Sequence, residues 1–161
     1  MKITDYLAIY ATVLSTVVFF WNVLQSRPKI RVDLIHGIEG TGDSMKSGAY
    51  IFVRNLSPHD VHLTNIDILY PYRSVELKEK LVHLWRYKRP PRTVGWVHSS
   101  LSNYSLESGC PVCLEARKSH RVFIPDSVLE NMFSQATERT LMAAAHDQLW
   151  NTAYSCKFKY A

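Results

Sequence analysis

The sequence predicts a mainly β protein, with an N-terminal transmembrane α-helix followed by a small antiparallel β-sandwich that carries one or two short helices. Three observations predict this plan. The stretch Tyr6 to Ser26 contains no Asp, Glu, Lys, Arg or His. Most of the remaining chain alternates apolar and polar residues between turn residues, which is typical of half-buried strands. Segments with helical spacing interrupt the strands near residues 75–85 and 127–134. A partly open barrel is the alternative arrangement of these strands.

The apolar stretch is long enough to cross a bilayer as a helix. Its 21 residues rise about 31 Å in a helix, close to the thickness of the hydrocarbon core. A cleavable signal peptide has a shorter apolar core and a small-x-small cleavage site, which the following residues do not provide. A helix buried in a soluble protein normally has a polar face, and an interfacial helix has a charged one. We therefore predict a span with its flanks in residues 1–27 and a membrane-proximal domain in residues 28–161.

Charges beside the span favour a cytoplasmic β-domain. Lys2 precedes the helix, whereas Arg27, Lys29 and Arg31 follow it, and cytoplasmic flanks carry the excess of basic residues. The chain has three cysteines, an odd number that suits a reducing compartment better than a disulfide framework. A periplasmic domain is the alternative, with a difference of two basic residues deciding between them.

The domain then reads as a series of short strands. Pro28 blocks continuation of the helix, and alternation begins immediately after it. A slip in the alternation near Thr64-Asn65 predicts a β-bulge, and Asp126 after Pro125 is the expected N-cap of a short helix. Residues 37–48 are expected to form a Gly-rich loop. The expected strands are 30–34, 49–54, 61–70, 93–98, 120–124, 140–145 and 150–160.

Positive charge is concentrated in residues 73–92. Seven Lys and Arg stand against two Glu in this segment, giving a net charge of +5 (7 − 2), equal to that of the whole chain. We consider a solvated charged face, contact with anionic headgroups, and binding of a protein or nucleic acid, for which the interleaved aromatic rings would stack on bases. The predicted interaction surface consists of Lys78, Lys80, Trp85, Arg86, Lys88, Arg89 and Arg92.

The other groups of candidate site residues are weaker evidence for a functional site. Cys110 and Cys113 have zinc-knuckle spacing, with His120 and Cys156 as further candidate ligands, but a second closely spaced pair is missing. We expect these two cysteines in a β-turn, with a zinc, redox or lipidation site as the alternative. The pair His59 and His62 fits a turn and strand without a metal. The pieces His98-Ser99-Ser100 and His146-Asp147 lack the nucleophile elbow that would frame a catalytic serine.

Several short motifs lie along the chain: Trp21-Asn22, Arg27-Pro28 with Ile30-Arg31-Val32, Val53-Arg54-Asn55 with Pro58, Val61-His62-Leu63, and Pro125 before a short helix. With these motifs the chain resembles a loose class of small bacterial and prophage proteins that have one N-terminal span, an Arg-Pro step and an immunoglobulin-like β-domain. The resemblance implies that fold and a bacterial inner-membrane location. In size and plan the chain is similar to superinfection-exclusion proteins of temperate phages, which stop the DNA of a second phage from entering the cell.

These observations predict a non-enzymatic, membrane-tethered interaction module that needs no cofactor. Its expected partners are the lipid bilayer and another protein at the membrane, from phage or host, with nucleic acid less favoured. One alternative is a zinc- or thiol-dependent site at the Cys-x-x-Cys segment. Another is a sensor subunit whose helix oligomerises. The sequence leaves the oligomeric state open.

Overall fold

The computed structural model describes residues 3–25, 28–40, 45–88 and 90–160. Helix α1 (Ile3–Gln25) confirms a long apolar N-terminal helix, with a length and composition that suit a membrane span. The hydroxyls of Thr12, Ser15 and Thr16 each donate to a carbonyl four residues earlier at 2.8 Å, so the helix itself satisfies these three polar groups. The predicted end of the span, Ser26, lies outside the described residues.

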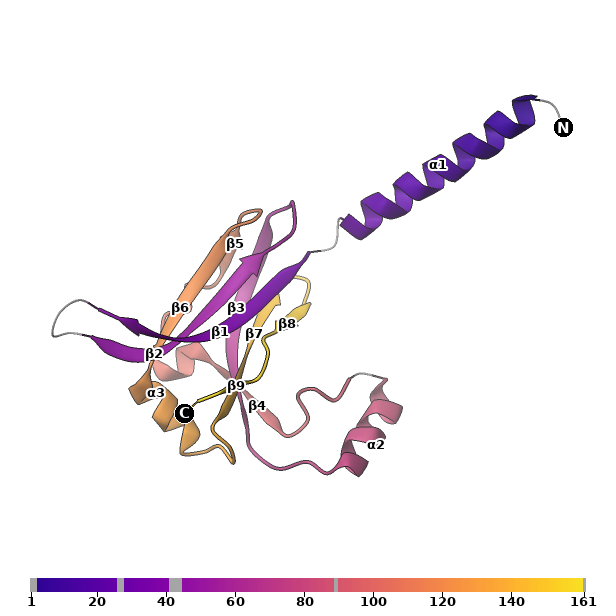
Figure 1. The fold of residues 1–161 in the computed structure, drawn as a ribbon. Coiled ribbons are helices and arrows are strands. Elements are labelled where there is room, and N and C mark those ends of the chain that lie inside the picture. The colour runs from indigo at the N-terminus through magenta and orange to yellow at the C-terminus, as the bar shows by residue number, and fades with distance from the viewer. Residues whose placement is uncertain (1–2, 26–27, 41–44, 89, 161) are drawn as a thin grey trace.

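The rest of the described chain is mainly β, in two antiparallel sheets (Figure 1). The smaller sheet has the order β1-β2-β6, and the larger has the order β4-β3-β7-β8, with β5 also pairing with β3 and β9 with β7. The elements after α1 are β1 (Ile30–Glu39), β2 (Lys46–Asn55), β3 (Val61–Pro71), α2 (Leu77–Tyr87), β4 (Trp96–Ser100), the 3-10 turn η2 (Leu101–Tyr104), β5 (Val112–Leu114), β6 (Ser119–Pro125), α3 (Asp126–Phe133), β7 (Thr140–Asp147), β8 (Thr152–Tyr154) and β9 (Phe158–Lys159).

One hydrophobic core lies between the sheets. Alternate residues of β2, such as Ile51 and Val53, pack with alternate residues of β3 and β7, such as Ile66 and Leu141. Helix α3 contributes three buried residues, including Met132, to the same core. The alternate residues of the larger sheet point to its outer face, which carries polar residues and a small buried cluster of Leu69, Met142 and Ala144.

Several predicted boundaries were wrong. Pairing extends strands into both ends of the expected loop at 37–48, since β1 continues to Glu39 and β2 starts at Lys46, with Glu39 opposite Lys46. Residues 41–44 of this loop lie outside the described residues. Asp126 is the first residue of α3 and Pro125 its N-cap. Cys113 lies in β5 rather than in a turn. The expected last strand, 150–160, divides into β8 and β9.

Gly48 is required by the close approach of β2 and β6. A Cβ atom at this position would lie 2.1 Å from the carbonyl oxygen of Ile124, whereas a Cβ at Gly37 would lie 2.6 Å from the ring of Tyr50. A half-buried ring can rotate away, but a paired backbone carbonyl cannot. We expect Gly48→Ala to lower the free energy of unfolding by about 1–3 kcal/mol, the usual cost of overpacking. Chemical denaturation should show a smaller loss for Gly37→Ala; equal losses would contradict this account.

Candidate functional site

Three ligand-bearing side chains meet on the outer face of the larger sheet. The register of β3 and β7 shifts between Leu63 and Asn65, which confirms the predicted bulge. After the bulge, Ile66 and Ile68 point into the core, so Asp67 between them points outward. Pairing places His146 of β7 opposite Asn65 and His98 of β4 opposite Leu69. Asp67 thus lies diagonally between one histidine on each neighbouring strand.

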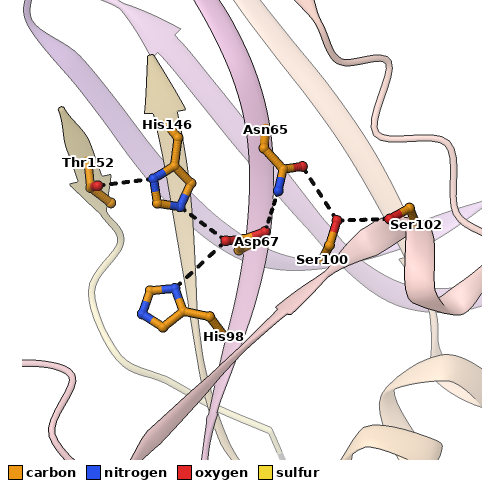
Figure 2. Close-up of polar contacts among 7 residues, drawn as sticks. All are labelled: Asn65, Asp67, His98, Ser100, Ser102, His146 and Thr152. Atoms are coloured by element: carbon orange, nitrogen blue, oxygen red, sulfur yellow. Dashed lines mark hydrogen bonds and ion pairs between the residues drawn. The ribbon is translucent and has the colours of Figure 1, made fainter. Parts of the chain in front are cut away.

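The carboxylate of Asp67 contacts both imidazoles through the same oxygen (Figure 2). His146 Nε2 lies 3.1 Å from Asp67 Oδ2, and His98 Nδ1 lies 3.7 Å from it. The three ligand atoms all lie within 4.8 Å of one another. Across residues 3–25, 28–40, 45–88 and 90–160, this is the single group of three or more His, Cys, Asp or Glu that converges in this way.

A second layer of hydrogen bonds fixes the cluster. His146 Nδ1 lies 3.0 Å from Thr152 Oγ1 on β8. Asn65 Nδ2 donates to the other carboxylate oxygen, Asp67 Oδ1, at 2.7 Å. Ser100 Oγ in turn lies 3.5 Å from Asn65 Oδ1 and 3.0 Å from Ser102 Oγ. The carboxylate is therefore oriented by Asn65 on its own strand, and the His146 ring by Thr152 on the adjacent strand.

The hydrogen bond from His146 lowers the pKa of the Asp67 carboxyl below its ordinary value, against the opposing effect of burial. Electrostatic attraction to His146 and His98 adds to this shift. The site thus favours an ionised carboxylate beside two imidazoles, a ligand set that suits transition metals. His146 pairs with Asp67 and not with its sequence neighbour Asp147, whose side chain accepts hydrogen bonds from Asn151.

Sequence reasoning missed this cluster because its members are far apart in the chain. His98 and His146 were considered only with their sequence neighbours, and Asp67 was not considered as a candidate. The available signal was an outward-facing polar residue after the predicted bulge. Only the strand order brings β4 and β7 to either side of β3.

The predicted interaction surface centres on α2, which is set apart from both sheets on the connection between β3 and β4 (Figure 1). No residue of this helix is buried. Lys80 and His83 are half-buried and lie on one face, and Arg73 on the preceding segment forms an ion pair with Glu79 at 3.0 Å. The half-buried residues of α2 therefore lie on its polar face.

The apolar face of α2 is exposed. Trp85 is 88% exposed and Leu81 is 65% exposed, and the residues at helical spacing beside them are also exposed. The exposed apolar residues of the helix are Leu77, Leu81, Val82, Leu84, Trp85 and Tyr87. This orientation is the reverse of a helix that packs on its own core, and contiguous exposed apolar surface marks an interaction site.

The basic residues predicted for this surface are distributed around and beyond α2. Lys78, Arg86 and Lys88 are exposed on or at the end of the helix. Lys80 and Arg92 instead line a groove against the larger sheet. Arg89 lies outside the described residues.

The cysteine candidates are not brought together with His120 as a ligand group in the described part of the chain. Cys113 and Cys156 are exposed free thiols. Cys110 is half-buried, and burial raises the pKa of its thiol against a weaker opposing hydrogen bond with Ser108. His120 Nε2 lies 2.8 Å from the Ser108 carbonyl oxygen.

No protein-family model matches this chain, and neither the curated proteins nor the solved structures contain a significant match.

Proposed function

We propose that this protein is a non-enzymatic interaction module with a single membrane span. Helix α2 of its β-domain binds the anionic surface of the bilayer that α1 crosses. The observation that carries the proposal is the outward apolar face of α2, led by Trp85 and Leu81. A helix with apolar residues on one side and basic residues around it binds at the headgroup boundary by burying the apolar side. Each Lys or Arg near an anionic surface adds about 1 kcal/mol.

The tether makes this contact efficient. Helix α1 ends at Gln25 and β1 begins at Ile30, so the connection reaches at most roughly 18 Å even if fully extended. The β-domain is therefore held beside the bilayer, and α2 meets the surface at a high effective concentration. Weak docking by one short helix is sufficient under these conditions.

The proposed topology and cellular location depend on the charges beside the span and on the resemblance in the arrangement of the chain. Lys29 and Arg31 after the span favour a cytoplasmic β-domain, where the leaflet is anionic. The resemblance in plan favours a bacterial inner membrane and an immunoglobulin-like arrangement of the two sheets. A fusion of a reporter enzyme to the C-terminus tests the topology, and periplasmic activity would overturn this assignment.

Charge reversal on α2 tests the docking. We expect the triple variant Lys78→Glu, Arg86→Glu, Lys88→Glu to lose protection of α2 amides from hydrogen exchange in nanodiscs that contain phosphatidylglycerol. A helix of 11 residues is marginal in water, so its amides exchange rapidly when it is undocked. The matched control changes the exposed residues Lys46, Arg117 and Lys159 to Glu and should keep the protection.

Nanodiscs of phosphatidylcholine alone should give little protection of α2 even in the unmodified protein. Equal protection in both lipids, or in the charge variant, would contradict an anionic surface as the partner. The same two variants test the biological role in bacteria challenged with phage. Restored plaque formation with the α2 variant alone supports superinfection exclusion through this surface, and full plating with the unmodified protein argues against that role.

A further inference from the structure

We propose that Asp67, His98 and His146 bind one divalent transition-metal ion of the Zn²⁺ class, with Asp67 Oδ2, His98 Nδ1 and His146 Nε2 as ligands. The three residues come from three adjacent strands and converge on the outer face of the larger sheet (Figure 2). The site is separate from α2, so it adds a second binding activity to the module.

Two of the three spacings between ligand atoms are close to those of tetrahedral coordination. Zinc lies about 2.0–2.1 Å from nitrogen and oxygen ligands, which places neighbouring ligand atoms roughly 3.3 Å apart in a tetrahedron. The two observed distances to Asp67 Oδ2, 3.1 and 3.7 Å, lie on either side of this value. Small rotations of side chains already in place would complete the site.

The supporting hydrogen bonds are those that a metal site needs. When His146 binds through Nε2, its Nδ1–H is free to donate to Thr152 Oγ1, the contact already present at 3.0 Å. Asn65 holds the Asp67 oxygen that does not face the imidazoles, at 2.7 Å. Such outer contacts fix ring orientation and raise the affinity of the ligands.

The chemistry of the surroundings selects the class of ion. Two nitrogen ligands favour Zn²⁺ and related metals over Mg²⁺ and Ca²⁺, which prefer oxygen. Leu69, Met142 and Ala144 form a small buried cluster on the same face, and an apolar border strengthens the attraction between ion and carboxylate. The side chains of Asp67, His146 and His98 are 13%, 18% and 38% exposed, so the fourth position is open to water or another ligand.

Metal titration of the full-length protein tests the site. Protein purified in detergent, freed of its affinity tag and stripped with chelator, should bind one Zn²⁺ per chain in competition with a chromophoric chelator. We expect His146→Ala to abolish stoichiometric binding and Thr152→Val to weaken it by about 10–100-fold. The control His62→Ala removes an exposed histidine from the same strand as Asp67 and should bind Zn²⁺ as the unmodified protein does.

Two further measurements keep the test decisive. His98→Ala, at the most exposed of the three positions, should also abolish stoichiometric binding without loss of the folded state, as judged by circular dichroism. Cobalt bound at the site should show visible absorption without the thiolate charge-transfer band that a cysteine ligand would add. No stoichiometric zinc in the unmodified protein, tight binding in folded His98→Ala, or loss of binding in Cys113→Ser would overturn the assignment.

Discussion

Replacing Leu81 and Trp85 with serine should release α2 from the membrane surface while the β-domain stays folded. Both side chains project into solvent, at 65% and 88% exposure, so the domain's own core does not depend on them. Burying a large apolar side chain contributes about 1.5–3 kcal/mol. We therefore expect the pair to weaken docking by at least about 100-fold, measured as lost protection of α2 amides in anionic nanodiscs.

The chain provides a matched control for this experiment. Leu149 and Trp150 form a second leucine-tryptophan pair with similar exposure, 77% and 86%, in the connection between β7 and β8. Replacing these residues with serine should leave the protection of α2 unchanged. If the control loses docking and the α2 variant retains it, the turn after β7 is the contact and α2 is not.

Replacing Asn55 with alanine should destabilise the domain more than any other single polar substitution in the turn after β2. Its side-chain amide donates to the carbonyls of His59, Leu114 and Glu115 at 2.7, 2.9 and 3.2 Å. Its oxygen accepts from the backbone N–H of Ser57 at 3.0 Å and also from the Ser57 hydroxyl. The residue is 1% exposed.

Removing this amide leaves several buried polar groups without a hydrogen-bond partner. Each such group costs about 1–3 kcal/mol, so we expect the free energy of unfolding to fall by about 3–5 kcal/mol. Denaturant titration of the detergent-solubilised protein measures the loss. Asn131→Ala, at an exposed position in α3, should change stability by less than about 0.5 kcal/mol. A loss at Asn55 as small as at Asn131 would show that water or a relaxed turn replaces the amide.

Asn55 illustrates what local sequence could predict. Asn and Ser side chains in turns commonly bond nearby backbone, and the contact from the Ser57 N–H to Asn55 is of this local kind. The contacts to Leu114 and Glu115 were not predictable, since they join segments about 60 residues apart. The requirement for Gly48 was likewise not predictable from the local sequence, because the clash that a side chain would cause there comes from the paired strand β6.

The sequence by itself determined the long apolar helix, the mainly antiparallel β character, the bulge near Thr64-Asn65 and the amphipathic segment that becomes α2. Each of these depends on the spacing of apolar and polar residues within one segment. Tertiary structure alone decided that α2 turns its apolar face outward and that Asp67 meets His98 and His146. Both depend on strand order and on which face packs against the core, and pairing between distant segments fixes these properties without a local signal.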